Sequence, residues 1–472
     1  MGKYFGTDGF RGKAGMDLTA EHAFKIGQFV GWWYRQPESG SESSKMVAET
    51  ESGIVPARIV IGKDTRKSSY MYENALAAGI TSMGSEAYLL HVTTTPCVSY
   101  ITRTEGFDCG IMISASHNPY FDNGIKLMNR EGEKMDDKTI EELEAFLDGE
   151  FGDGIKRELP RITGDGIGKT RDFYSGRNRY IGYLAGIPTR SFEKRTVALD
   201  CANGASWMIA GAVFNALGAK TQIINADPDG VNINRGCGST HLESLKEYVR
   251  THNCDCGFAF DGDADRCLAV DEHGNEINGD IIMYICSKWM KRQGLLPSNT
   301  VVTTIMSNIG LYKALDEEGI AYEKTNVGDR YVYENMKEND HMIGGEQSGH
   351  VIFRKYAHTG DGLVTALMVM GVMIDTNLPL SALAAGCRIY PQVLKNVEVD
   401  DKDGTLGDET VKAMVKTVEE KLGNDGRVLL RKSGTEPVLR VMAEAGTKDD
   451  CEEAVDAIIG AMKTSGHLLK VR

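Results

Sequence analysis

The chain has 472 residues, of which 41% are hydrophobic and 25% are charged, proportions typical of a globular protein. Its 53 lysine and arginine residues are outnumbered by 67 acidic residues, and the resulting net charge of −14 argues against broad nucleic-acid binding. The same charge repels anions, so an anionic substrate would need a local cationic pocket.

The length predicts three or four domains, because one domain usually holds about 100–200 residues. Residues 1–6 lack the apolar core of a secretory signal, and no apolar run is long enough to span a membrane. The ten cysteines are scattered, and the closest pair, Cys254 and Cys256, matches no zinc pattern. We therefore expect a cytoplasmic protein with reduced cysteines and no membrane partner.

The first motif is residues 5–12, Phe-Gly-Thr-Asp-Gly-Phe-Arg-Gly. Its glycines suit a tight loop that closes on a ligand, and Arg11 could reach a phosphate. A plain turn would explain the glycines but not Arg11. Thr19 is the predicted N-cap of a helix that runs to Trp33. Residues 36–53 are rich in Ser, Glu and Gly, which predicts an exposed insertion.

Strands and helices are predicted to alternate through most of the chain, as in parallel or mixed α/β sheets. The predicted strands lie at residues 59–61, 88–90, 109–113, 196–199, 222–224, 258–260, 300–304 and 342–343, and the predicted helices at 70–83, 141–147 and 210–217. Thr240 and Glu243 form a capping-box pattern that predicts the start of another helix. The repeated order predicts three related α/β domains with mixed sheets, each with a functional loop after a strand.

From Pro391 the pattern changes to that of a small α+β domain. Strands are predicted at residues 396–399, 426–430 and 438–443, and helices at 410–422 and 449–462. The stretch 149–168 is rich in Gly and charge and marks a first boundary. We predict domains at residues 1–160, 161–276, 277–388 and 389–472.

The loop after the strand at 109–113 carries Ser116 and His117, and Lys126 follows a few residues later. The Ser116 hydroxyl could attack or carry phosphorus. His117 could move a proton or steady an anion, and Lys126 adds a cation. On this stretch alone, a polar turn after a strand is an equally good interpretation.

Asp261, Asp263 and Asp265 alternate with small residues directly after a predicted strand. In an extended segment such side chains point the same way, and they repel one another unless a cation lies between them. Oxygen ligands favour a hard ion, so we predict Mg²⁺. An acidic surface turn is the plain alternative. The closest motif, the EF-hand, requires a later glutamate and a glycine that are missing here.

Two further stretches indicate sugar phosphate binding. Arg431, Ser433, Gly434 and Thr435 have the composition of a phosphate clamp, with a fork-shaped cation, two hydroxyls and an accessible backbone. A structural hairpin would explain Gly434 but not the density of donors. Residues 345–350, Gly-Glu-Gln-Ser-Gly-His, offer partners for sugar hydroxyls, a weak signal by itself.

The order serine loop, metal loop, sugar loop and phosphate loop resembles the α-D-phosphohexomutase family over nearly the whole chain. Residues 114–119, Ser-Ala-Ser-His-Asn-Pro, and 261–266, Asp-Gly-Asp-Ala-Asp-Arg, are together highly specific for that family. Within it, residues 4–12, 327–332 and 345–350 are similar to the bacterial branch that acts on amino sugars, and Gln347 points to that branch.

The resemblance implies four domains in a heart shape around a deep central cleft, with one loop per domain. Ser116 would carry a phosphate that passes to the phosphosugar, and the resulting 1,6-bisphosphate would turn around and return its other phosphate. The implied reaction interconverts glucosamine 6-phosphate and glucosamine 1-phosphate and feeds UDP-N-acetylglucosamine synthesis. A mutase of glucose or mannose phosphates is the alternative. Catalytic amounts of sugar 1,6-bisphosphate would act as activator.

The resemblance also implies roles for individual residues. One Mg²⁺ would be held by Ser116, through its phosphate, and by the three aspartates. Ser116, His117, Lys126, Arg11 and His350 would be catalytic. The substrate would contact Arg266, Asp329, Glu346, Ser348, Arg431, Ser433, Gly434 and Thr435. The implied partner is a phosphosugar, not nucleic acid, and a homodimer stays open.

Two departures from the family pattern stand out. Ala264 occupies a position where glycine is usual in the amino-sugar branch, and we expect it to face away from the metal on an alternating segment. The insertion at residues 36–53 has no counterpart. Two other classes of protein compete with a mutase. A phosphatase would need the acidic loop but no serine carrier or second clamp, and a silent phosphosugar binder could dispense with Ser116 and Lys126.

Overall fold

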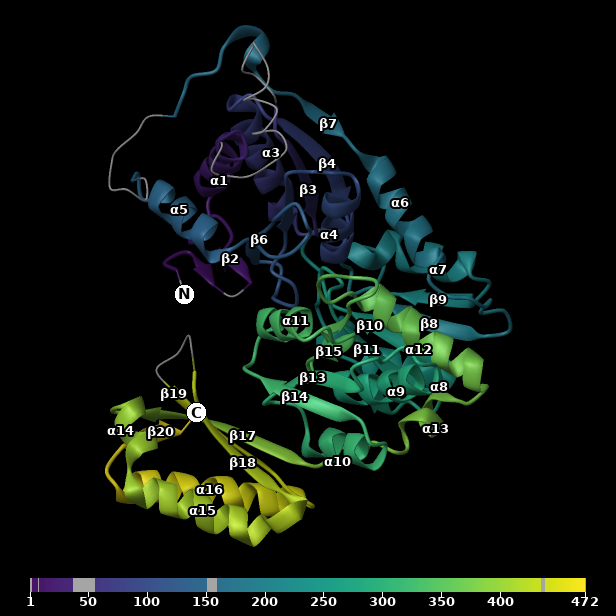
Figure 1. Cartoon of the computed structure of the whole chain (residues 1–472), viewed down its shortest axis with the longest axis vertical. Helices are drawn as coiled ribbons and strands as arrows, with labels where there is room; N and C mark the ends of the chain where they lie inside the picture. The colour runs from purple at the N-terminus through teal and green to yellow at the C-terminus, as the bar shows by residue number, and fades with distance from the viewer. Residues whose placement is uncertain (1, 7, 37–55, 151–158, 434–437, 472) are drawn as a thin grey trace. The chain divides into compact units, whose positions relative to one another are not determined.

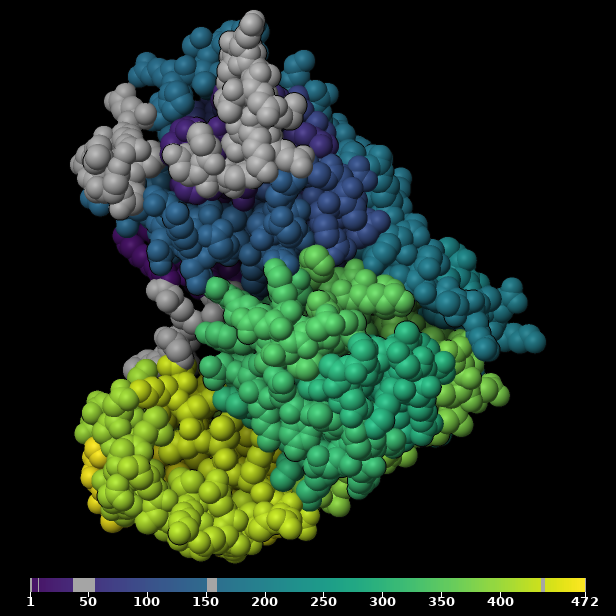
Figure 2. Space-filling view, viewed as in Figure 1, coloured from purple at the N-terminus to yellow at the C-terminus, as the bar shows by residue number. Residues whose placement is uncertain are grey.

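The computed structural model describes residues 2–6, 8–36, 56–150, 159–433 and 438–471. Most of the predicted insertion, residues 37–53, lies outside the described residues, as do Gly434 and Thr435. The chain forms two compact bodies, Met1–Met306 with Ile320–Ala385, and Ser307–Gly319 with Gly386–Arg472. None of the helices in the described part of the chain is long and apolar enough to cross a membrane. Within the first body, successive stretches of the chain form separate regions of the surface (Figure 2).

The first sheet of the first body has the strand order β1-β2-β6-β5-β3-β4-β7 (Figure 1). Its strands are β1 (Phe5–Gly6), β2 (Gly9–Lys13), β3 (Arg58–Lys63), β4 (Glu86–Val92), β5 (Cys109–Ile113), β6 (Asp122–Met128) and β7 (Thr170–Asp172). β3 pairs in parallel with β4 and β5, whereas β6 runs antiparallel to β5. The strands predicted in this region are confirmed, and the sheet is mixed.

Helices cover both faces of this sheet. They are α1 (Ala20–Trp33), α3 (Lys67–Ser82), α4 (Thr95–Thr104) and α5 (Asp137–Leu147). Thr19 caps α1 as predicted, and His22 completes the capping box by accepting the N–H of Thr19. Ile59 and Ile61 of β3 belong to the core cluster formed with α1 and α3, so the intervening Val60 faces the other side of the sheet. Burying each such side chain stabilises the fold by about 1.5–3 kcal/mol.

Two further sheets of the first body have the orders β12-β11-β10-β8-β9 and β14-β13-β15-β16. The first of them contains β8 (Thr196–Asp200), β9 (Lys220–Ile224), β10 (Cys256–Phe260), β11 (Cys267–Asp271) and β12 (Glu276–Ile277), with α7 (Ala210–Ala216) and α8 (Glu243–Thr251) between the strands. The second contains β13 (Thr300–Thr304), β14 (Ala321–Thr325), β15 (Ile343–Gly345) and β16 (Val351–Phe353), with α11 (Asp329–Glu338). The other α-helices among the described residues of this body are α6 (Tyr174–Ala185), α9 (Gly279–Arg292), α12 (Gly362–Thr376) and α13 (Leu380–Ala384).

All three sheets share one arrangement of four strands. In each, a parallel trio ends in an antiparallel strand, in the orders β4-β3-β5-β6, β9-β8-β10-β11 and β14-β13-β15-β16. The serine loop (residues 114–121), the metal loop (261–266) and the sugar loop (346–350) each join the third strand to the antiparallel fourth. This topology confirms the prediction of related α/β units with one functional loop after a strand in each.

The second body contains an antiparallel sheet of order β18-β19-β17-β20. Its elements are α10 (Ile309–Glu317), β17 (Gln392–Val399), α14 (Lys402–Gly407), α15 (Glu409–Leu422), β18 (Arg427–Lys432), β19 (Val438–Glu444), α16 (Lys448–Thr464) and β20 (Leu468–Val471). Val397, Val441 and Val455 are among the buried residues that join the sheet to α15 and α16. The predicted α+β character of the C-terminal region is confirmed.

The capping box predicted at Thr240 and Glu243 is wrong. Thr240 ends a short 3₁₀ turn, Gly238–Thr240, and α8 begins only at Glu243, after Leu242, which makes no side-chain cap. The N–H of His241 donates to the Gly238 carbonyl, so the chain completes a separate turn before the helix starts. The hydroxyl of Thr240 is therefore two residues too early to cap α8.

Candidate active site

Ser116 is held in a strained backbone conformation in the serine loop. Its φ of +52° lies in the left-handed region, which costs a residue with a side chain about 1–2 kcal/mol. Its N–H donates to the Ser114 Oγ at 2.9 Å, and its own Oγ donates to the Oδ2 of Asp261 at 2.5 Å. Both side chains are buried. The strained turn therefore directs the Ser116 hydroxyl at the metal loop.

The backbone of the serine loop is clamped from two sides. The buried guanidinium of Arg66 forms an ion pair with Asp64 and donates to the Ser116 carbonyl at 2.9 Å and to the Asn118 carbonyl at 2.9 Å. The side-chain amide of Asn234, from the second α/β unit, donates to the Ser116 carbonyl as well, at 2.9 Å. Neither Arg66 nor Asn234 was predicted, because the sequence around each residue does not show that its side chain is buried against the serine loop.

The metal loop brings three carboxylates together. One oxygen atom from each of Asp261, Asp263 and Asp265 lies within 4.8 Å of the others, and all three residues are buried. The predicted cluster is confirmed, but the predicted extended backbone is wrong: the loop is a turn, with Ala264 at φ +56°. A turn this tight places neighbouring acids on one side without strand alternation. A Cβ on Gly262 would lie 2.5 Å from the Ser116 carbonyl oxygen, so this approach of the two loops requires glycine.

The cluster fits a hard cation. Burial, and then its neighbours Asp265 and Asp263, raise the pKa of Asp261 well above its usual range. Burial also opposes ionisation of Asp263, but the Lys126 ammonium and the Thr95 hydroxyl bring its pKa down to about 2. Asp263 Oδ1 and Asp265 Oδ1 are buried and accept no hydrogen bond from any described residue. A Mg²⁺ ion would satisfy oxygen atoms whose burial is otherwise costly.

Cations surround the carboxylates. The Lys126 Nζ lies 2.9 Å from Asp263, 3.2 Å from Asp265 and 3.1 Å from Asp8. Burial lowers the pKa of Lys126, but these three acids raise it by more, so the ammonium keeps its proton. Arg11 forms an ion pair with Asp8. The sequence analysis missed Asp8, although it stands three residues before Arg11 in the first motif.

Three further groups next to Ser116 have unused hydrogen-bonding capacity. The Nε atoms of Arg11 and Arg266 are buried and donate to no group in the described chain, so each arginine keeps a donor available for an anion. The Nδ1 of His117 lies 3.3 Å from the Ser116 Oγ. Burial, Arg266 and Arg11 lower the pKa of His117 to about 4, so its imidazole is neutral at pH 7.

The sugar loop is a tight turn between β15 and β16. The N–H of Glu346 donates to the His350 carbonyl at 3.0 Å, and Glu346 Oε1 accepts the N–H of Gly328 at 3.1 Å. Gly349 has a φ of +91°, and a Cβ there would lie 2.4 Å from the Cys267 carbonyl oxygen of β11. Ser348 is exposed. His350 Nε2 accepts the N–H of Gly360 at 3.2 Å.

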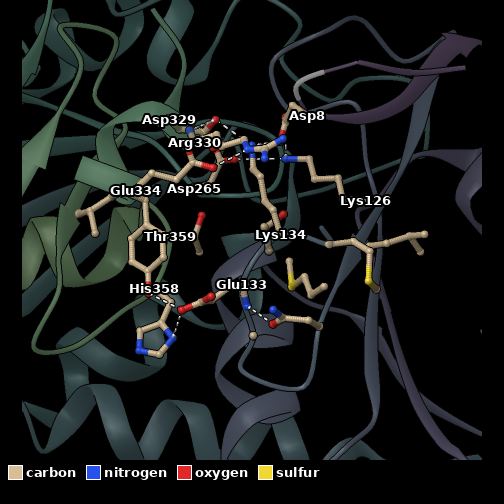
Figure 3. Close-up of a pocket in the computed structure, with 18 of the residues that line it drawn as sticks. Asp8, Lys126, Glu133, Lys134, Asp265, Asp329, Arg330, Glu334, His358 and Thr359 are labelled. Carbon is tan, nitrogen blue, oxygen red and sulfur yellow. Dashed lines mark hydrogen bonds and ion pairs between the residues drawn. The ribbon is translucent and has the colours of Figure 1, made fainter. Parts of the chain in front are cut away.

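A cavity of about 260 Å³ adjoins these loops (Figure 3). Its wall includes Asp8, Lys126, Asp265, Asp329 and His350, which come from all three α/β units. Of the predicted site residues in the first body, Lys126, Asp265, Asp329 and His350 line this cavity. Those that do not line it are Arg11, Ser116, His117, Asp261, Asp263, Arg266, Glu346 and Ser348.

The predicted phosphate clamp lies in the second body. Arg431 of β18 is directly opposite Arg440 of β19. Both Nε atoms are buried without a hydrogen-bond partner among the described residues. Burial and then Arg440 lower the pKa of Arg431. Like charges directly across two strands destabilise a sheet, so the pair suits an anion that bridges it. Arg440 was missed because only the strand register reveals it.

Four family models match the chain in order. They are described as Phosphoglucomutase/phosphomannomutase, with alpha/beta/alpha domain I at residues 2–151, domain II at 178–274, domain III at 278–390 and the C-terminal domain at 394–461. A phosphoglucosamine mutase of Lachnospira eligens is 58% identical over 468 residues, which cover 99% of this chain and 100% of the relative. That of Bacillus subtilis is 46% identical over 464 residues, 98% of this chain and 99% of the relative.

Solved structures share the fold. A phosphoglucomutase/phosphomannomutase family protein from Burkholderia thailandensis has a TM-score of 0.78 at 23% identity and covers 98% of this chain and 97% of its own. The N-acetylphosphoglucosamine mutase of Aspergillus fumigatus in complex with GlcNAc-6P and magnesium has a TM-score of 0.68 at 17% identity and covers 98% of this chain and 96% of its own. At these identities the likeness is one of fold.

Proposed function

Because the chain belongs to the phosphoglucomutase/phosphomannomutase family, we propose that it is a phosphoglucosamine mutase that interconverts glucosamine 6-phosphate and glucosamine 1-phosphate. The observation that carries this proposal is the buried Ser116 hydroxyl, 2.5 Å from a cluster of three carboxylates. The relatives that match over nearly the whole chain, at 58% and 46% identity, bear that name. The glutamine at position 347 supports the same branch.

In the active form, Ser116 carries a phosphoryl group on its Oγ. A sugar hydroxyl attacks the phosphorus, the bond from phosphorus to the Ser116 Oγ breaks, and the hydroxyl proton passes to a base. The product is a 1,6-bisphosphate. After it turns around, its other phosphoryl group returns to the Ser116 Oγ and the new hydroxyl is reprotonated. His117 and His350 are the candidates for the base, because the Lys126 ammonium keeps its proton. The exchange consumes no water and no second substrate.

One bound Mg²⁺, held by the three aspartates and the Ser116 phosphate, would neutralise negative charge and polarise the phosphoryl group for attack. Arg11 and Arg266 keep unused N–H donors and would stabilise the three equatorial oxygens during transfer. Lys126, which keeps its proton among Asp8, Asp263 and Asp265, adds positive charge beside the same oxygens.

Two sets of residues would hold the sugar while it reacts at either end. Glu346, Ser348 and Asp329 would contact hydroxyl groups that are presented alike in both orientations. Arg431, Ser433, Gly434 and Thr435, joined by Arg440, would bind whichever phosphate is not reacting. Four domains, divided at residues 160, 276 and 388, would each supply one of these loops. Sugar 1,6-bisphosphate would be required in catalytic amounts to restore any enzyme that loses its phosphate.

A direct assay tests this proposal. Purified protein is supplied with Mg²⁺ and glucose 1,6-bisphosphate, and its turnover is compared on the 1-phosphates of glucosamine, glucose and mannose. The amino sugar is expected to have the highest kcat/KM, and chelation of the metal is expected to abolish turnover. Faster turnover of glucose 1-phosphate or mannose 1-phosphate would assign the protein to the other branch of the family. We place the reaction in the cytoplasm, in line with ten cysteines that form no disulfide.

A further inference from the structure

Lys134 forms one ion pair with Asp8 of its own α/β unit and one with Asp329 of the third unit. Its Nζ lies 2.7 Å from Asp329 Oδ1 and 3.1 Å from Asp8 Oδ1 (Figure 3). Burial lowers the pKa of Lys134, but Asp329 and Asp8 raise it by more, so the ammonium stays charged. Lys134 follows β6, whereas Asp329 opens α11, so residues 195 positions apart in the chain meet at this ammonium.

The two carboxylates connect Lys134 to different loops of the site, Asp8 to the metal loop and Asp329 to the sugar loop. Asp8 also pairs with Arg11 and Lys126, and the Lys126 ammonium reaches the metal loop at Asp263. Alternating charges therefore run from the metal loop through Asp8 to Lys134 without a gap. Such an arrangement holds its members in place only while each charge keeps its counter-charge.

The second carboxylate, Asp329, lies next to the sugar loop. Asp329 Oδ2 lies 3.4 Å from His350 Nε2. The residue before it, Gly328, adopts a φ of +134° and donates its N–H to the Glu346 carboxylate. A shift of Asp329 would therefore displace Glu346, at the start of the sugar loop, through the Gly328 backbone, and it would move the Asp329 carboxylate relative to the His350 imidazole at the end of the loop.

We propose that Lys134 is a positioning residue that fixes the sugar loop relative to the serine and metal loops. It acts through Asp8 and Asp329. A misplacement of about 1 Å in a reacting geometry can cost about 100-fold in rate. The bisphosphate intermediate must stay bound while it turns, so it is the species most sensitive to a displaced sugar loop. This inference rests on the proposed mutase function.

The test is Lys134→Met, which keeps most of the length of the side chain and removes its charge, assayed in the full-length protein. The measured quantity is the concentration of glucose 1,6-bisphosphate that gives half-maximal mutase activity. When a loosely held intermediate escapes, it leaves Ser116 without phosphate, and added bisphosphate must return one phosphoryl group to the Ser116 Oγ. The half-saturating concentration is independent of the amount of folded enzyme. It is expected to rise at least tenfold in Lys134→Met.

The matched control is Lys337→Met. Lys337 joins the same two α/β units through Glu133 at 2.8 Å, but it is mostly exposed and contacts neither Asp8 nor Asp329. Its half-saturating concentration is expected to stay within twofold of that of the unmodified protein. Lys134→Arg keeps the charge, and its half-saturating concentration is expected to lie within threefold of that of the unmodified protein. Lys134→Gln is measured as a second neutral variant, and thermal unfolding identifies which neutral variants are folded.

Three results separate the outcomes. An unchanged bisphosphate requirement in a folded neutral variant would overturn the role of Lys134. An equal rise of the half-saturating concentration in Lys337→Met would show that any ion pair between the two units has this effect, and it would also overturn the specific role of Lys134. If the unmodified protein fails to turn over glucosamine phosphates at all, the proposed function fails first, and the two failures are thereby distinguished.

Discussion

The serine, metal and sugar loops occupy the same place in three sheets of one topology, yet different residues make the turn. Every residue of these loops is described, and each loop has one residue in the left-handed region: Ser116 at φ +52°, Ala264 at +56° and Gly349 at +91°. Glycine adopts this conformation freely, whereas a side chain costs about 1–2 kcal/mol. The turn is thus a feature of the shared topology, whereas the type of residue in the left-handed position depends on what each loop does.

The reasons for the three residues differ. At 116 the hydroxyl has to point at the carboxylates, so the cost of the strain is offset by what the side chain does. At 349 a Cβ would collide with the Cys267 carbonyl, so glycine is required by space. At 264 neither reason applies, since the methyl group of alanine neither reacts nor forms hydrogen bonds. We therefore expect the strain at Ser116 to be tied to function and the strain at Ala264 not to be.

The hairpin of the second body offers a second contrast. In the first body, the buried cations Arg66 and Lys126 have acidic partners in Asp64 and Asp263. Within the described residues, the opposed pair of Arg431 and Arg440 has no such partner. We expect charges of the first kind to hold loops in place and the Arg431–Arg440 pair to bind an anion.

The largest effect is expected at Ser116. Ser116→Ala and Ser116→Gly both remove the hydroxyl, and each is expected to lower kcat on the order of 10⁴-fold or more, as loss of a nucleophile does in other enzymes. Because glycine relieves the left-handed strain, Ser116→Gly is expected to be more stable than Ser116→Ala by about 1 kcal/mol. Activity assays and urea unfolding measure both quantities.

Retained activity in Ser116→Ala would indicate a phosphatase that uses an aspartate as its nucleophile and would break the link between strain and chemistry. A covalent phosphate on the Ser116 peptide of the unmodified protein, detected by intact mass before and after phosphatase treatment, is the positive counterpart of the same experiment.

A smaller effect is expected from Asp263→Asn. The substitution removes one negative charge from the cluster and leaves the Lys126 ammonium with Asp8 and Asp265. We expect kcat to fall about 10²- to 10³-fold, the range seen when one preorganised electrostatic group is lost. We also expect the Mg²⁺ concentration for half-maximal activity to rise. A Mg²⁺ titration of both proteins checks this, and an unchanged half-maximal concentration would place the metal elsewhere.

Arg440→Met tests whether the Arg431–Arg440 pair of the second body, unlike the paired cations of the first body, serves to bind an anion. Loss of a charged hydrogen bond to phosphate, worth about 1.5–3 kcal/mol, is expected to raise KM roughly 10- to 100-fold. In the absence of phosphate the variant is expected to be at least as stable as the unmodified protein, because the repulsion with Arg431 is gone. Thermal unfolding with and without inorganic phosphate measures this.

Lys412→Met is the control for Arg440→Met, because it breaks an exposed ion pair with Glu409 on α15 and leaves the arginine pair intact. It is expected to change KM and the phosphate-dependent stabilisation by less than twofold. Loss of stability in phosphate-free Arg440→Met would mean that the guanidinium has a structural partner and is not held ready for an anion.

The positions of the serine and metal loops after their strands were predicted correctly from the sequence, although part of the reasoning was wrong. Three acids within five positions meet whether the backbone is extended or turned, so the cluster was predicted correctly from a wrong conformation. Asp8, Arg66, Lys134 and Arg440 were missed because their partners are defined by tertiary pairing or strand register. Charged residues are common on surfaces, and a single sequence does not show which of them are buried.

The smallest effect, at Ala264, separates topology from chemistry most directly. Ala264→Gly gives up a buried methyl group, worth about 0.8 kcal/mol, but relieves a left-handed backbone that costs about 1–2 kcal/mol. The two terms nearly cancel, so we expect a change in the free energy of unfolding within about 1 kcal/mol and less than a twofold change in kcat. Ala269→Gly removes an equally buried methyl from β11, where the backbone is an ordinary strand, and is expected to lose about 2 kcal/mol. Urea unfolding of the pair isolates the backbone contribution at 264. Equal destabilisation by the two substitutions would show that the left-handed turn at 264 is not strained, and the distinction drawn between Ser116 and Ala264 would then be lost.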